Sequence, residues 1–120
     1  MAITIKRIYE APDASDGFRI LVDRLWPRGL SKDKAKIDLW LKDVAPSDDL
    51  RKWFGHNPER WGEFKERYFQ ELVTRGHFVD SIAQKEARGR VTLLYAAKNQ
   101  EFNNAVALKE YIEKNLLKSK

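Results

Sequence analysis

The segment that decides the fold is Phe18-Arg19-Ile20-Leu21-Val22-Asp23-Arg24-Leu25-Trp26-Pro27-Arg28-Gly29. Its first half is an apolar run as long as one strand, and Pro27 ends that strand because proline supplies no N–H to a sheet ladder. A strand that is apolar on both faces is typical of a buried parallel sheet. In open α/β sheets, ligands bind outside the carboxyl ends of such strands. We therefore expect Asp23, Arg24 and Arg28 to lie at a functional edge.

The other expected strands of the sheet are residues 3–9, 37–41 and 90–97. Helical spacing dominates the middle and the end of the chain, where Ser47 is a good N-cap and Asn57-Pro58 is a helix start signal. The expected helices cover residues 31–36, 48–54, 58–75 and 80–87, and a last segment with the apolar stripe Ala105, Leu108, Ile112 and Leu116. This order predicts a single three-layer α/β domain over residues 1–120, with a small, mostly parallel sheet of about four strands flanked by helices.

Composition narrows the classes of function. The 120-residue chain has no Cys, which excludes disulfides, Cys-ligated zinc and a thiol nucleophile. Its two His residues have no close ligand partners in sequence, and no glycine-rich phosphate loop is present, so we expect neither a metal nor a cofactor. No apolar run approaches the ~20 residues that cross a bilayer, and no secretory signal begins the sequence. We expect a cytoplasmic protein that does not bind membranes.

The formal net charge is +5, which admits a nucleic acid, a nucleotide or another acidic partner. Much of the excess lies near the C-terminus, where lysines at the end of a helix favour its dipole. The remaining charges are mixed in sign along the sequence, so charge alone does not choose among these partners.

Asp23 permits two interpretations. A poorly hydrated carboxylate is tolerated when it is paired, so an ion pair with Arg24 or Arg28 would fix the turn around Pro27. Alternatively, the arginine forks bind a phosphate or carboxylate ligand, while Asp23 orients a hydroxyl group or acts as a general base.

A second polar turn follows the other buried strand. In a parallel sheet, Lys98 and Asn103 open on the same edge as Asp23, and the last helix, capped by Asn103 or Asn104, offers N–H groups to an anion. A simple capped helix explains the same residues. His56 lies between two helices, and it is either an acid or base or a cap of the preceding helix.

Several stretches together resemble the YeaO-like proteins, a bacterial group in the domain-of-unknown-function 488 family. They are Val22-Asp23-Arg24-Leu25-Trp26-Pro27-Arg28-Gly29, Trp40-Leu41-Lys42-Asp43, Leu50-Arg51-Lys52-Trp53-Phe54-Gly55-His56 and Leu93-Leu94-Tyr95-Ala96-Ala97-Lys98. The resemblance covers nearly the whole chain, and it implies no particular reaction because the group is uncharacterised.

Departures from the family pattern are also informative. Other branches are similar in having a Cys-Ala-Glu segment where this chain has Tyr95-Ala96-Ala97, and a Cys-His-Arg segment at the final strand-helix turn. Both Cys, the Glu and the His are missing here, so the resemblance carries over no thiol chemistry. It also implies a His at the position of Phe102 in YeaO-like relatives.

These residues favour a protein that binds, or binds and turns over, an anionic small molecule such as a nucleotide or sugar phosphate. The expected ligand contacts are Asp23, Arg24, Arg28, Lys98 and Asn103, and the candidates for catalysis are Asp23 and His56. One alternative is a nucleic-acid-binding module that uses Arg and Lys with aromatic residues. Another is a protein-interaction or regulatory domain with a Trp-rich surface.

Overall fold

The apolar segment that begins at Phe18 forms β2 of a four-stranded, all-parallel sheet. The computed structural model describes residues 3–116, and its strands lie in the order β1-β4-β2-β3. They are β1 (Ile3–Arg7), β2 (Phe18–Leu21), β3 (Leu39–Trp40) and β4 (Val91–Tyr95). The last strand in sequence thus lies between the first two, and every residue of β4 is buried. The predicted α/β class and parallel sheet are confirmed.

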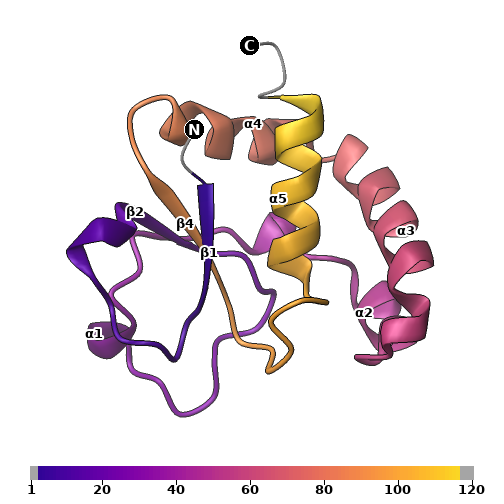
Figure 1. The fold of residues 1–120 in the computed structure, drawn as a ribbon, viewed down its shortest axis with the longest axis horizontal. Coiled ribbons are helices and arrows are strands. Elements are labelled where there is room, and N and C mark those ends of the chain that lie inside the picture. The colour runs from indigo at the N-terminus through magenta and orange to yellow at the C-terminus, as the bar shows by residue number, and fades with distance from the viewer. Residues whose placement is uncertain (1–2, 117–120) are drawn as a thin grey trace.

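The helices cover the two faces of the sheet unequally. They are α1 (Lys32–Ala35), α2 (Asp48–Phe54), α3 (Trp61–Val73), α4 (Gly76–Glu86) and α5 (Asn104–Asn115), with 3-10 turns at Ala14–Asp16, Lys42–Val44 and Pro58–Arg60. Figure 1 shows α3, α4 and α5 to one side of the strands and the short α1 to the other. Within residues 3–116, no helix is both long and apolar enough to cross a membrane.

Alternation along the strands assigns side chains to the two faces. Ile20 and Leu93 join the large core cluster that includes Phe64, Tyr68 and Leu108 of the helices. Residues one step along each strand form a smaller cluster on the other face, with Leu21 and Leu94 at its centre and with Trp26, Leu30, Ile37 and Trp40 packed against it. The segment that links β2 to β3 therefore covers the second face largely without helix.

Beside this smaller cluster lies a buried polar group. Arg19, only 4% exposed, donates to Asp16 Oδ2 at 2.5 Å and to the carbonyls of Ala35 and Lys36 at the end of α1. Lys6 Nζ also contacts Asp16, at 3.1 Å from both carboxylate oxygens. Although burial opposes it, these cations and the Asp13 backbone N–H hold the pKa of Asp16 below its ordinary value.

Strand ends differ from the sequence-based boundaries because Asp side chains replace ladder carbonyls. Asp38 accepts the Arg19 N–H through its carboxylate at 2.8 Å, so the expected strand 37–41 shortens to Leu39–Trp40. Asp23 accepts the Ala96 N–H in the same way at 2.9 Å, beyond the ends of β2 and β4. The expected strands 18–25 and 90–97 are correspondingly shorter.

Most helix signals in the sequence are confirmed. Ser47 caps α2 through Leu50 N, and α2 covers the expected residues 48–54. Asn57-Pro58 begins a 3-10 turn that leads into α3. The expectation that Gly76 ends this run is wrong, because α3 ends at Val73 and Gly76, without a positive φ, is the first residue of α4.

Candidate functional site

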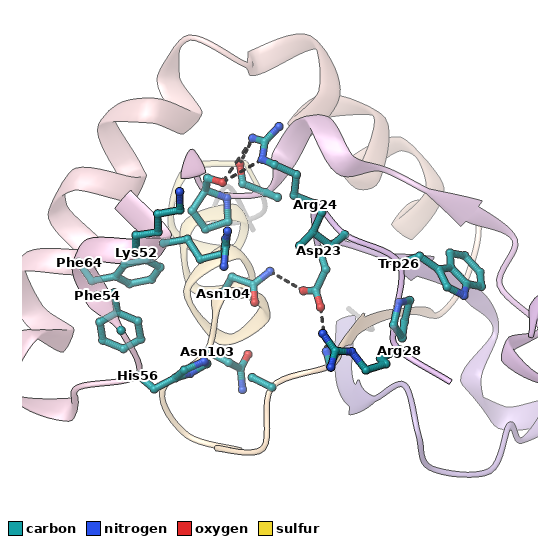
Figure 2. A pocket seen from close by; sticks show the side chains of 18 of the residues that line it. Asp23, Arg24, Trp26, Arg28, Lys52, Phe54, His56, Phe64, Asn103 and Asn104 are labelled. Atoms are coloured by element: carbon teal, nitrogen blue, oxygen red, sulfur yellow. Dashed lines mark hydrogen bonds between the residues drawn. The ribbon is translucent and has the colours of Figure 1, made fainter. Parts of the chain in front are cut away.

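A cleft of about 570 Å³ opens at the carboxyl ends of β2 and β4. Most of its lining comes from three segments: the loop after β2, the turn from β4 into α5, and the end of α2 with the residues that follow (Figure 2). Its lining includes Asp23, Arg24, Arg28, Arg51, Lys52, Phe54, His56, Phe64, Asn103 and Asn104. The position is the one at which open parallel sheets bind ligands.

Asp23 connects the end of β2 to three other parts of the fold: the end of β4, the start of α5 and β3. Its carboxylate accepts the Ala96 N–H at 2.9 Å and the Asn104 Nδ2–H at 3.0 Å, and Asn104 also donates to the Val22 carbonyl. The indole N–H of Trp40 donates to the Asp23 carbonyl at 2.8 Å. Asp23 therefore fixes the end of β2 against β4 and the start of α5.

Of the two interpretations of Asp23, the ion pair with Arg24 or Arg28 is wrong. Neither guanidinium lies within 4.0 Å of the Asp23 carboxylate, which neutral amides satisfy instead. Burial raises the pKa of Asp23, and the hydrogen bonds from Asn104 and Ala96 offset part of that effect. Because amides hold the carboxylate, both arginines remain available for other contacts.

Arg24 and Arg28 lie on different parts of the loop and differ in their contacts. Arg24 donates to the carbonyls of Ala45 and Pro46 at 3.3–3.4 Å and lies 3.9 Å from the Asp48 carboxylate. The Arg28 side chain is exposed and has no ion pair or hydrogen bond with residues 3–116. Its backbone is held, because the Tyr9 hydroxyl donates to the Arg28 carbonyl at 2.8 Å.

Lys52 and His56 reach the cleft from α2 and the residues after it. Both are exposed, and neither side chain has a partner in the described part of the chain. The expectation that His56 caps α2 is wrong, because the Gly55 N–H closes that helix on Arg51 O. His56 has a φ of 59°, a left-handed conformation that turns the chain toward Asn57. Figure 2 shows Lys52 and Arg28 on opposite sides of the cleft, with Asp23 and Asn104 between them.

Asn103 is the N-cap of α5, as one of the two sequence interpretations required. Its side-chain oxygen accepts the Val106 N–H at 3.0 Å, and its Nδ2–H donates to the Asn99 carbonyl at 2.9 Å. Asn103 is 3% exposed, and its polar side-chain atoms form hydrogen bonds within the turn even though the residue lines the cleft. The neighbouring Asn104 carries the contact with Asp23.

Lys98 lies outside the cleft, in an adjoining hollow of about 880 Å³. This hollow is lined by Arg7, Tyr9, Arg28, His56, Ala96, Ala97, Lys98 and Asn99. Five of these residues, among them Arg28 and His56, also line the cleft, so the two spaces are contiguous. The Lys98 side chain is exposed and has no partner within residues 3–116.

Folding gathers positive charge at this edge. Six cationic side chains line the two spaces: Arg7, Arg24, Arg28, Arg51, Lys52 and Lys98. Asp23 is the one carboxylate among the lining residues, so the lining has a formal excess of five positive charges. That excess equals the net charge of the whole chain, which means that the remaining residues balance.

Lys52 and Arg7 carry no sequence signal that marks them as site residues. Lys52 lies on a helix that was expected, but its place in the cleft depends on how α2 docks, which no local signal gives. Arg7 ends β1 and donates to Ala96 O and Ala97 O while its guanidinium lies 4.8 Å from the centre of the Tyr9 ring. Ala97, where the resemblance places a Glu in other branches, lines both spaces.

The aromatic residues are largely occupied by packing. Phe64 and Tyr68 are buried, as expected, and Phe102 packs on Trp61 with ring centres 5.4 Å apart. The ring of Trp53 has the guanidinium groups of Arg60 and Arg67 over it, 5.0 and 4.5 Å from its centre. Among the described residues, the exposed large apolar side chains are Tyr9, Leu25 and Val73, and none is a Trp. All four Trp side chains are half-buried.

A parallel sheet with a positively lined cleft at its carboxyl edge defines a small α/β protein with one candidate ligand site. The chain belongs to the domain-of-unknown-function 488 family, because the family model described as "Inactive DUF488-N3 subclade" matches residues 2–120. The resemblance to YeaO-like proteins is thereby confirmed.

The relatives are themselves uncharacterised. The chain is 40% identical to the uncharacterised protein YeaO of Escherichia coli K12. The 112 aligned residues cover 93% of this chain and 97% of YeaO. It is 38% identical over 110 residues, 92% of each chain, to the uncharacterised protein Rv3073c of Mycobacterium tuberculosis H37Rv. No solved structure matches significantly.

Proposed function

We propose that this protein binds an anionic small molecule, of the class of nucleotides and sugar phosphates, in the cleft at the carboxyl edge of the sheet. The observation that carries the proposal is that two cations on opposite sides of one cleft, Arg28 and Lys52, have no partner among residues 3–116. Arginine and lysine side chains left free in a concave site are suited to phosphate and carboxylate groups.

The shape and lining of the cleft agree with a ligand that has an anionic group and an uncharged part. Its volume of about 570 Å³ is within the range of small-molecule sites. Phe54, Phe64 and Pro46 supply apolar surface near the cations, and the Asp23 carboxylate lies between them. An anionic group would contact Arg28 and Lys52, and a hydroxyl group of the same ligand would donate to Asp23.

The proposal is for binding, and turnover is not part of it. The two candidates for catalysis are Asp23 and His56, but Asp23 is held by Ala96 and Asn104, and His56 has no acid or base partner to orient it among the described residues. The word "Inactive" in the description of the matching family model agrees with a binding role.

The test compares ligands that differ only in a phosphate group. AMP or ribose 5-phosphate should raise the unfolding temperature, and adenosine or ribose should raise it much less because they lack the phosphate group. A ligand at 100 times its Kd adds about 2.7 kcal/mol of stability, which is enough to measure. Arg28→Ala should weaken phosphate-dependent binding at least roughly tenfold, since it removes a charge-assisted contact.

Arg88→Ala is the matched control, because Arg88 is also exposed but precedes β4 at the other edge of the sheet. Equal effects of the two variants would contradict the proposal.

Binding of a single-stranded oligonucleotide tests the nucleic-acid alternative. Oligonucleotide binding that requires Arg28 and falls steeply with salt, in the absence of any response to the small phosphates, would favour the nucleic-acid alternative instead.

A further inference from the structure

We infer that the ligand carries two separated anionic groups, one held in the cleft and the other in the adjoining hollow. This inference rests on the proposed function and specifies its ligand class. It predicts that a bisphosphorylated small molecule binds more tightly than its monophosphorylated counterpart, and that one lysine accounts for much of the difference.

The arrangement of the free cations supports two anion subsites. Three cations in the lining have no partner within residues 3–116: Lys52 lines only the cleft, Lys98 lines only the hollow, and Arg28 lines both. Arg28 thus lies at the boundary between the two spaces, and each space has one further free cation of its own. A ligand with one anionic group can satisfy only one side of this arrangement.

The other three cations of the lining already have partners within the protein, so Arg28, Lys52 and Lys98 are the ones free to bind a ligand. Arg51 pairs with Asp48 at 3.4 Å, and Arg24 and Arg7 donate to backbone carbonyls. The hollow has no carboxylate in its lining, and the Asp23 carboxylate in the cleft is engaged by amide donors. No acidic side chain in either lining therefore competes with a ligand for Arg28, Lys52 or Lys98.

Each of the three free cations stands on a fixed piece of backbone. The Tyr9 hydroxyl holds the Arg28 carbonyl. The turn after Lys98 is fixed because the Asn99 side chain accepts the N–H groups of Glu101 and Phe102. Lys52 lies on α2, which is capped at both ends. Fixed backbones with free side chains reduce the ordering cost of binding a ligand between them.

The test measures binding of fructose 1,6-bisphosphate and fructose 6-phosphate by calorimetry at one salt concentration. We expect the bisphosphate to bind at least tenfold more tightly. Lys98→Ala should reduce the bisphosphate affinity about tenfold and leave the monophosphate affinity unchanged, whereas Arg28→Ala should weaken both. Lys34→Ala, an exposed lysine on α1, is the matched control and should change neither by more than twofold. Circular dichroism and thermal unfolding of each variant confirm that it is folded.

Equal affinities for the two sugars, or a bisphosphate affinity that Lys98→Ala does not change, would overturn the two-subsite inference. If binding in that case still depends on Arg28, the proposed function of a single anion site stands. If neither sugar binds and the phosphate-dependent shifts of the earlier test are also missing, the proposed function itself fails. Equal losses in Lys98→Ala and Lys34→Ala would indicate general charge attraction and would also overturn the inference.

Discussion

At the scale of single residues, the two carboxylates that flank β2, Asp16 before it and Asp23 after it, have different partners. Asp16 forms ion pairs with two cations, Lys6 and Arg19. Asp23 accepts hydrogen bonds from neutral amides at the edge of the cleft. Their pKa values accordingly move in opposite directions, lowered for Asp16 and raised for Asp23. Charge pairing thus stabilises the interior, whereas Asp23 at the cleft leaves Arg28 and Lys52 without an ion pair among residues 3–116.

The Asp16 contacts predict a large loss of stability in Asp16→Asn. The substitution leaves Arg19, 4% exposed, without its carboxylate, and removing one partner of a buried ion pair costs about 3 kcal/mol or more. Urea unfolding monitored by circular dichroism measures the change. Asp33→Asn, an exposed acid in the first turn of α1, is the control and should change the free energy of unfolding by less than about 0.5 kcal/mol.

The same substitution should change the response to acid. The pKa of Asp16 in the folded protein lies below its ordinary value of 3.8. Its contribution is therefore fully present above that value and is lost as the pH falls through the folded-state pKa. The stability difference between the wild type and Asp16→Asn should shrink as the pH falls below about 4. A difference that stays constant from pH 6 to pH 2.5 would contradict this assignment.

At the scale of elements, local signals predicted the helices better than the strands. Ser47 and Asn103 cap helix starts with their own side chains, so the local sequence predicts where these helices begin. The strand ends depend instead on partners distant in sequence, because Asp38 takes the amide of Arg19 and Asp23 takes the amide of Ala96. No local pattern contains that information.

The start of β2 requires glycine at position 17. Gly17 has a φ of 68°, and a Cβ atom there would lie 2.3 Å from the carbonyl oxygen of Arg90, which accepts the Phe18 N–H. Gly17→Ala should therefore destabilise the protein by roughly 2 kcal/mol or more. Gly62→Ala is the opposite case, because Gly62 is exposed in α3 with open space around it. It should stabilise by about 0.5–1 kcal/mol.

Denaturant unfolding of the two glycine variants under identical conditions checks both signs. Loss of stability in Gly17→Ala without a change in the denaturant dependence would indicate a folded-state clash. If both variants were equally tolerated, the close approach of the Gly17 backbone to Arg90 would not be the reason for the glycine.

At the scale of the whole molecule, β4 holds the sheet together. It pairs with β1 over five residues and with β2 over four, whereas β3 pairs only with β2 and over two residues. Because β1 and β2 do not touch each other in the sheet order, their alignment depends on β4. The cleft shares this dependence, since its two main loops follow β2 and β4.

This topology predicts how stability is distributed. Amides of Leu93 and Leu94 should exchange with solvent only through global unfolding, so their exchange free energies should equal the value from denaturant unfolding. Amides at the edge strand β3 should exchange through local opening, with lower free energies. Native-state hydrogen exchange followed by NMR makes the comparison, and faster exchange in β4 than in β3 would contradict it.

The candidate site was also only partly predictable, for a reason of the same scale. Position after a buried strand identified Asp23, Arg24, Arg28 and Lys98. It could not show that Asp23 binds amides rather than arginines, because Asn104 lies 81 positions away in sequence. Nor could it show that Lys52 faces the cleft or that the cations from six separate positions gather there. Those facts depend on how the helices and loops pack against the sheet.

The central place of β4 also has a consequence during protein synthesis. Ribosomes add about 5–20 residues per second, so the edges of β1 and β2 that pair with β4 lack that partner for on the order of ten seconds. Unpaired strands exposed for that time can pair with other chains. In β2 the buried Arg19 is part of the strand itself, and a charged side chain pointing out of an unpaired strand discourages such pairing. We therefore expect the residue that pairs with Asp16 in the finished fold to limit such pairing before β4 is made.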